Sequence, residues 1–283
     1  MSASKQINLV LEAVNGLAVQ GVGGTPHLRV IAEPSPDPNQ TDVFVFLQDF
    51  GPGADPIAVL SEPGSDTEYT ITAWSYSPSN DTYEGCVSFS ATARGMGRVR
   101  AMGEVNGRLV RLQSDYRLQQ VTDDRSHDIH SNDGDLSLHL DAESLPGSEA
   151  YLVIMPPGAA PGLLPEGLVM IGTPYDVTAS GALITLERPA VLKLRYDGLL
   201  VESSSAPEGL GIYRWDPVGE TWREVPGHLD EEQRAVVAPV TTFSTYALLA
   251  PPGAWIDPWE GAIFLPVILR DYSANLTPTS TPT

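Results

Sequence analysis

Short runs of β-branched, aromatic and aliphatic residues recur along this chain, and each run is bounded by glycine, proline, asparagine or aspartate. Tyr69–Ala73 alternates apolar with polar side chains, which is typical of a strand with one buried face. Val43–Leu47 is continuously apolar, which predicts a central strand buried on both faces. Amphipathic stretches of helical length are scarce. The pattern therefore predicts an all-β protein of the sandwich type.

The predicted strands group into two β-sandwich domains in tandem. We expect residues 6–121 to form an immunoglobulin-like sandwich and residues 136–250 to form the second sandwich. Between them, residues 122–135 are a polar linker that contains five aspartates. Residues 251–283 comprise an edge segment and a C-terminal Thr/Pro-rich linker. In this last part Ile263–Leu269 is suited to an edge strand, since Pro266 has no N–H to donate to a ladder.

The expected strands of the first domain are Ile7–Val14, Leu17–Val22, His27–Ala32, Val43–Gln48, Ile57–Leu60, Glu68–Tyr76, Cys86–Ala93, Arg98–Val105 and Leu109–Leu118. Those of the second are Leu136–Leu140, Tyr151–Met155, Leu168–Ile171, Tyr175–Thr178, Leu183–Leu186, Ala190–Tyr196, Leu210–Trp215, Trp222–Val225, Ala235–Val240 and Phe243–Leu249. Asp216–Gly219 has the composition of a tight turn, so we expect Trp215 and Trp222 to belong to one hairpin.

The charge balance narrows the range of partners. The chain has 36 Asp and Glu against 16 Lys and Arg, for a net charge of −20. Such a surface repels phosphate backbones and anionic lipids, which argues against nucleic acid and membrane-surface binding. The sequence contains no run of 18 apolar residues, so it predicts no membrane-spanning helix. The start of the sequence carries no signal peptide. We expect an extracellular or cell-surface location, with the export signal absent from this sequence.

The single cysteine, Cys86, excludes an internal disulfide framework and a cysteine-based zinc site. We expect it at the end of a strand, where it is more often inert than reactive. The sequence also lacks the nucleophile-elbow, phosphate-loop, dinucleotide-binding and zinc-protease motifs. An enzyme of a familiar class is therefore not expected.

Several motifs of the second domain occur in a recognisable order: Ser131–Gly134, Leu163–Gly167, Leu168–Asp176, Arg188–Leu192, Tyr196, Ile212–Asp216, Trp222 and Phe243–Leu248. This order resembles a module of secreted proteins of filamentous bacteria such as the Chloroflexota. The tail, Phe264–Arg270 followed by Thr-Pro repeats, is similar to the end segment of such proteins. More distantly, the module is similar to the β-sandwich domains of ankyrins and netrin receptors, whose self-cleaving members include the function-to-find domain. The resemblance implies a bacterial surface protein. The first domain resembles no such family.

The resemblance makes the Phe243-Ser244 bond a candidate for self-cleavage. In that chemistry a serine hydroxyl attacks its own preceding carbonyl, and a nearby base takes the proton. The relatives commonly place a histidine before the phenylalanine, or a His/Glu pair on a neighbouring strand. Here Thr242 precedes Phe243, and the nearest histidine is His228, with Glu224 upstream. The alternative, which we favour, is that Phe243 packs in the core and Ser244 is an ordinary strand residue.

The linker between the domains contains candidate metal ligands. Calcium prefers hard oxygen donors close in sequence, and four residues supply them: Asp128, Asn132, Asp133 and Asp135. No glutamate follows at the distance that a calcium loop requires, and a solvated linker is the favoured alternative. Three histidines lie nearby, at positions 127, 130 and 139, and we expect these to be solvated surface residues. No other cofactor is expected.

Aromatic side chains suggest a glycan as a further ligand. The candidates are Trp74, Tyr76 and Tyr83 around one loop, and Trp255 and Trp259 around another. Exposed aromatic rings stack on sugars, but tryptophan in a sandwich more often fills the core.

Five arginines cluster on either side of Val105: Arg94, Arg98, Arg100, Arg108 and Arg111. Alternation places Arg98 and Arg100 on one face of a strand, and we expect them to pair with acidic side chains rather than with a ligand.

The leading hypothesis is a non-catalytic structural or adhesive module of a bacterial extracellular or cell-surface protein. Its partners would be other domains of the same protein or another surface protein. The alternatives are a self-cleaving sandwich that uses Ser244 and a carbohydrate-binding module. The sequence does not identify the ligand, the oligomeric state or a catalytic domain elsewhere in the gene.

Overall fold

The computed structural model describes residues 26–157, 160–180, 185–196 and 209–252. These residues form strands and turns without a helix, so the predicted all-β class is confirmed. The expected strands Ile7–Val14 and Leu17–Val22 lie outside the described residues, as do part of Leu183–Leu186 and the edge segment Ile263–Leu269. The strands are β1 (His27–Pro34), β2 (Gln40–Gln48), β3 (Ile57–Ser61), β4 (Glu68–Ile71), β5 (Ser75–Ser77), β6 (Thr82–Ser90), β7 (Gly95–Val105), β8 (Arg108–Thr122), β9 (His127–His130), β10 (Leu136–Leu140), β11 (Glu149–Met155), β12 (Val169–Ala179), β13 (Thr185–Arg195), β14 (Gly211–Asp216), β15 (Thr221–Val225), β16 (His228–Asp230), β17 (Ala235–Thr242) and β18 (Thr245–Ala250).

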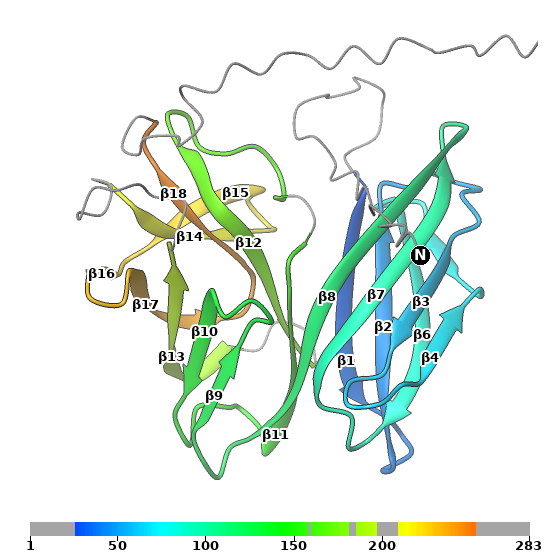
Figure 1. The fold of residues 1–283 in the computed structure, drawn as a ribbon, viewed down its shortest axis with the longest axis horizontal. Coiled ribbons are helices and arrows are strands. Elements are labelled where there is room, and N and C mark those ends of the chain that lie inside the picture. Colours follow the sequence, from blue (N-terminus) through cyan, green and yellow to red (C-terminus); the bar gives the residue numbers. More distant parts are fainter. Residues whose placement is uncertain (1–25, 158–159, 181–184, 197–208, 253–283) are drawn as a thin grey trace, which may run out of the picture.

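The strands form three antiparallel sheets, of which one runs through the whole molecule (Figure 1). Sheet A has the order β1-β2-β6-β5, and sheet C has the order β16-β17-β13-β10-β9. Sheet B has nine strands in the order β15-β14-β18-β12-β11-β8-β7-β3-β4. Sheet B therefore contains strands from both sides of the polar segment 122–135, and β8 and β11 join its two halves.

Two hydrophobic cores lie on opposite faces of sheet B, and β11 contributes to both. Tyr151, Val153 and Met155 are buried in the core beneath sheet A, whereas Leu152 and Ile154 are buried in the core beneath sheet C. Because successive side chains of a strand point to opposite faces, one strand can serve two cores in this way. The sequence of β11 is continuously apolar from Ala150 to Met155 because both faces of the strand are covered.

A buried carboxylate adds a polar link between β1 and the second half of the molecule. Asp176 on β12 has a side-chain exposure of only 7%, and its Oδ2 lies 2.9 Å from Nε of Arg29 on β1. The hydroxyl of Thr245 donates to Oδ1 of Asp176 at 3.1 Å. The hydroxyl of Thr178, two residues along β12, donates to the carbonyl of Val30 at 3.1 Å. The edge of β1 is therefore held against β12 by side-chain bonds.

Two sequence predictions about individual strands were wrong. Strand β2 alternates, with Val43, Val45 and Leu47 fully buried while Phe44 and Phe46 lie partly buried on the outer face of sheet A. Its continuous apolar pattern therefore does not reflect burial on both faces. Cys86 lies within β6 rather than at a strand end, and its thiol is exposed on the outer face. Partial desolvation raises the pKa of this thiol, which disfavours the reactive thiolate.

The hairpin between β7 and β8 has a turn that the sequence specifies locally. Asn106 and Gly107 both adopt left-handed backbone conformations, with φ of 51° and 74°. A type I′ turn requires this conformation at both central residues, and Asn-Gly is its preferred sequence. The pairing then runs without a shift from Val105 opposite Arg108 to Gly95 opposite Leu118. The turn thus fixes which side chains of β7 and β8 face outward.

We predict that Asp176→Asn lowers the free energy of unfolding by about 1.5–3 kcal/mol, because Arg29 and Thr245 lose a charged, buried acceptor. Urea denaturation of the whole chain measures this change. Glu68→Gln is the matched control: Glu68 pairs with Arg100 where both side chains are about half-exposed, and such pairs contribute about 0–1 kcal/mol. Equal losses in the two variants would contradict a specific role for Asp176.

Candidate interaction face

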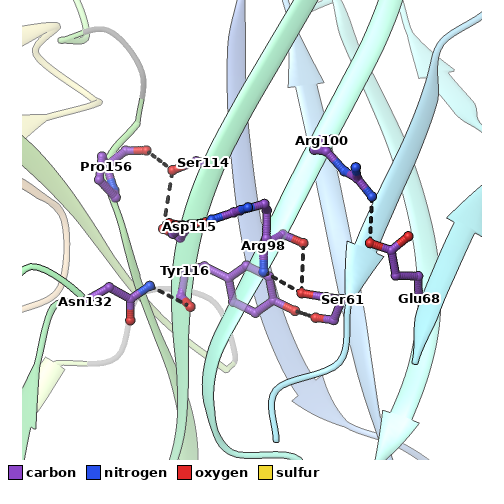
Figure 2. A network of polar contacts seen from close by, with 9 residues as sticks. All are labelled: Ser61, Glu68, Arg98, Arg100, Ser114, Asp115, Tyr116, Asn132 and Pro156. Atoms are coloured by element: carbon purple, nitrogen blue, oxygen red, sulfur yellow. Dashed lines mark hydrogen bonds and ion pairs between the residues drawn. The ribbon is translucent and has the colours of Figure 1, made fainter. Parts of the chain in front are cut away.

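Arginines that lie close together in the sequence also lie together on the outer face of β3, β7 and β8. Arg98 lies 2.6 Å from Asp115 across the β7–β8 pair, and Arg100 lies 2.6 Å from Glu68 on β4 (Figure 2). The prediction that Arg98 and Arg100 share a face and pair with acidic side chains is confirmed. All four side chains are about half-exposed, so these pairs organise the surface more than they stabilise the fold.

The same face displays large apolar side chains to solvent. Ile57 on β3, Met96 and Met102 on β7, and Leu109 on β8 are exposed by 40, 58, 39 and 57%. They account for half of the large hydrophobic residues that are exposed in the described part of the chain. Ile57 stands opposite Met102 in the strand register, and Met102 stands opposite Arg111. We call this outer surface of β3, β7 and β8 the interaction face.

Further arginines lie on the interaction face in addition to the paired ones. Arg111 and Arg117 point to the same side of β8 as Asp115, and neither has a side-chain partner among the described residues. Methionine, arginine and aromatic residues are enriched where proteins meet, whereas lysine and aspartate are depleted. In a chain with a net charge of −20, a face that combines exposed apolar side chains with unpaired arginines is distinctive.

Hydrogen bonds and close packing beneath the interaction face hold its three strands together. The hydroxyl of Tyr116 donates to the carbonyl of Ser61 at 2.7 Å, and the backbone N–H of Arg98 donates to Oγ of Ser61 at 2.7 Å. The ring of Tyr116 is fully buried against Gly97, where a Cβ atom would lie only 2.4 Å from it. Burial also raises the pKa of Tyr116 well above its usual value of 10.0. These contacts fix β3, β7 and β8 relative to one another.

Two contacts anchor β8 to the second half of the molecule, as Figure 2 shows. Oγ of Ser114 donates to the carbonyl of Pro156 at 2.9 Å, just after β11 ends. Nδ2 of Asn132 donates to the carbonyl of Tyr116 at 3.2 Å. Asn132 was a candidate calcium ligand, but here its amide nitrogen satisfies a carbonyl at the edge of β8.

Two of the remaining calcium candidates, Asp128 and Asp133, bond to different side chains. Asp133 accepts bonds from Oγ of Ser131 at 2.5 Å and from the hydroxyl of Tyr175 at 2.6 Å. Asp128 instead lies 2.7 Å from Nδ1 of His139, and the backbone N–H of Asp135 donates to Asp133 at 3.1 Å. In the described ranges, no group of three or more histidine, cysteine, aspartate or glutamate side chains is placed to hold a metal.

The three histidines near this segment have different surroundings. His127 lies with Nε2 2.9 Å from the backbone N–H of Thr122, so it is bonded to the main chain. His139 lies between Asp128 and Asp141 and is partly exposed. His130 is exposed on β9. The structure therefore does not bring the three together at one point.

The first aromatic group faces inward. Tyr83 is 6% exposed, and its hydroxyl bonds to Gly51 and Ala54, while Tyr76 packs against its ring at 4.6 Å. Trp74 is half-buried, with its ring against Gly85 and its Nε1 buried without a described partner. These side chains fill the core rather than form a platform for a sugar. The other two candidates, Trp255 and Trp259, lie outside the described residues.

The Phe243-Ser244 bond lies between β17 and β18, where the chain crosses from sheet C to sheet B. The expected strand over this bond is thus interrupted by a sharp crossing. The hydroxyl of Ser244 donates to the carbonyl of Trp215 at 2.6 Å, and Phe243 is 8% exposed. His228 pairs with Val237 on β17. Val237 lies about 15 Å or more along β17 from the end of the strand at Thr242, where the chain turns to Ser244. The structure therefore does not bring His228 to the hydroxyl of Ser244.

The predicted Trp215–Trp222 hairpin is confirmed. The two residues stand opposite each other in β14 and β15, with ring centroids 5.7 Å apart. Nε1 of Trp222 donates to the carbonyl of Pro161 at 3.0 Å, and Gly162 lies against the ring of Trp215. The Pro/Gly-rich crossing between β11 and β12 therefore covers this aromatic pair.

Sequence reasoning did not identify the apolar part of the interaction face. The available signal was the alternation in β7, where small residues occupy the inward positions and Met96, Arg98, Arg100 and Met102 occupy the outward ones. No family model matches the chain, and no curated protein or solved structure matches it either. Within the described residues, no helix has the length and apolar character needed to cross a membrane.

We predict that His139 titrates above its usual pKa of 6.5, because its hydrogen bond to Asp128 favours the charged ring. The resulting stabilisation is fully present below pH 6.5 and is lost as pH rises through the raised pKa. An NMR titration of the ring checks this. Asp128→Asn should lower the pKa of His139 more than Asp141→Asn does, since Asp141 lies at the longer distance of 3.3 Å. A pKa that neither variant moves would contradict the assignment.

We also predict that the chain stays intact at Phe243-Ser244, because the Ser244 hydroxyl donates to the carbonyl of Trp215 and the expected base, His228, lies opposite Val237 on β17. A denaturing gel should show one band of the same mobility for the chain and for Ser244→Ala. A pair of shorter bands that disappears in Ser244→Ala would establish self-cleavage instead.

Proposed function

We propose that this chain is a non-catalytic adhesive or structural module of a bacterial extracellular or cell-surface protein. The observation that carries the proposal is the interaction face, on which Ile57, Met96, Met102 and Leu109 are exposed beside arginines. Exposed apolar residues that neighbour one another on one surface, as Ile57, Met102 and Leu109 do in the strand register, mark sites of protein association. The proposal includes two sandwiches. Sheet A packs on strands β8, β7, β3 and β4 of sheet B to form an immunoglobulin-like sandwich. Sheet C packs on the other strands of sheet B to form the second sandwich.

The charge of the interaction face indicates the kind of partner. Arg111 and Arg117 have no described partners, while the chain as a whole carries 36 acidic against 16 basic residues. A surface protein with a similar excess of carboxylates would meet this face with complementary charge. We therefore expect the partner to be an acidic protein surface, such as a neighbouring module of the same protein or another surface protein.

The two alternative functions have less support from the described residues. A carbohydrate module needs exposed aromatic rings, whereas Tyr83 and Trp74 are packed inward. A self-cleaving module needs a base at Ser244, and the hydroxyl there is bonded to the carbonyl of Trp215.

Labelling of intact cells tests the proposal. Antibodies against the described region should label the bacterium that encodes the chain without permeabilisation, and the fluorescent chain should bind those cells saturably. The double variant Met102→Glu with Leu109→Glu should reduce this binding about tenfold or more, because it places carboxylates in the apolar part of the interaction face. The matched control is Val191→Glu with Leu229→Glu, which changes exposed apolar residues on sheet C.

Labelling that requires permeabilisation would refute the surface location. Binding that falls equally in both double variants, or in neither, would refute the role of the interaction face. Circular dichroism and urea denaturation of each variant show whether the fold is retained. We expect it to be, because Met102, Leu109, Val191 and Leu229 are all exposed, by 39, 57, 41 and 36% respectively.

A further inference from the structure

Strand β8 lies between β7 and β11 in sheet B, and it extends well beyond the end of β11. It pairs with β7 from Arg108 to Leu118, but it pairs with β11 only from Arg117 to Thr122. Strand β11 ends at Met155, and the chain then leaves sheet B at Pro156. Above this point Figure 1 shows β8 and β12 diverging. Among the described residues, no strand pairs with the second edge of β8 between Arg108 and Ser114.

This edge has the properties of a template for another strand. The backbone N–H and C=O groups of every second residue along an edge lack a strand to pair with. Native proteins usually blunt such edges with proline, a bulge or a very short strand. Here the segment Arg108–Ser114 contains no proline, and its register with β7 runs without a bulge. Its protection consists of the charged side chains of Arg108 and Arg111.

Side chains beside the edge define what an added strand would meet. On the inner side, Val110 and Leu112 are half-buried and pack against the first core. On the outer side, Leu109, Arg111 and Gln113 belong to the interaction face and are exposed. An added strand would thus need apolar side chains next to Val110 and Leu112, and a carboxylate next to Arg111.

We propose that the Arg108–Ser114 edge of β8 binds an extended segment of a partner protein by strand addition. The segment alternates apolar with acidic residues, so that backbone hydrogen bonds give affinity while Arg111 and the Val110–Leu112 surface give selectivity. The proposal rests on the proposed function, since it specifies how a partner engages the interaction face. Charge complementarity favours an acidic segment, and proteins that are as acidic as this chain offer many.

Hydrogen exchange with synthetic peptides tests strand addition. A capped octapeptide that alternates valine and aspartate should bind saturably and slow the exchange of those amides of 108–114 that point away from β7. The same peptide with lysine in place of aspartate should bind about tenfold more weakly, a difference of about 1.4 kcal/mol. A peptide with proline at alternate positions should give no protection, because it cannot complete the ladder.

Variants of the protein assign the effect to this edge. Arg111→Glu should weaken the aspartate peptide about tenfold and should favour the lysine peptide instead. Arg111→Gln gives an intermediate affinity for both peptides if the fold is retained. Arg125→Glu is the matched control, since Arg125 is an exposed arginine in the turn before β9, away from this edge. Its peptide binding should be unchanged.

The outcomes separate the two proposals. If neither peptide protects the amides of 108–114, or if Arg111→Glu leaves the preference unchanged, strand addition is wrong. The interaction face would then still be supported if Met102→Glu with Leu109→Glu reduced binding to intact cells. Alternate amides of 108–114 already bond to β7, so only the remaining ones, which point away from β7, report on the edge. If these are protected in the free chain, the edge is occupied by another part of the same protein, and binding of a partner there is refuted.

Discussion

Strand β11 is the element on which the rest of the structure depends, because it is covered on both faces. Its six residues from Ala150 to Met155 are all at most 5% exposed, and they alternate between the two cores. A fully buried large apolar side chain contributes about 1.5–3 kcal/mol, so several in one strand outweigh any single polar link between the halves. The ion pair between Arg29 and Asp176 therefore orients β1 on β12, while β11 supplies most of the cohesion.

The same strand also explains where the molecule presents its exposed surfaces. Sheet C covers the part of sheet B on one side of β8. The same face continues over β7 and β3, where no described strand covers it. Strand β11 ends at Met155 whereas β8 continues for several residues past that level, so one edge of β8 there pairs with no described strand. The interaction face and the edge thus arise from one arrangement: a long hairpin that extends beyond a shorter central strand.

Much of the local structure could be predicted from short stretches of sequence. Asp216–Gly219 predicted the Trp215–Trp222 hairpin, because turn geometry depends on a few adjacent residues. Burial was harder to predict. The apolar run Val43–Leu47 suggested a strand covered on both faces, yet Phe44 and Phe46 are only partly buried. The strand that is covered on both faces is β11. Both strands are runs of apolar residues, and only the position of the strand in the sheets distinguishes them.

The sequence alone determined the all-β class, most strand positions and the clustering of arginines near Val105, since these follow from alternation and turn composition within about ten residues. Only the tertiary structure decided that one nine-stranded sheet connects both halves and that the candidate calcium ligands Asp128 and Asp133 bond to different side chains. It also showed that Ser244 bonds to Trp215 and that Ile57 stands beside Met102. The physical reason is that strand pairing joins residues far apart in the chain. Which strands pair, and how far each extends past its neighbour, depends on the burial of the whole molecule rather than on any local pattern.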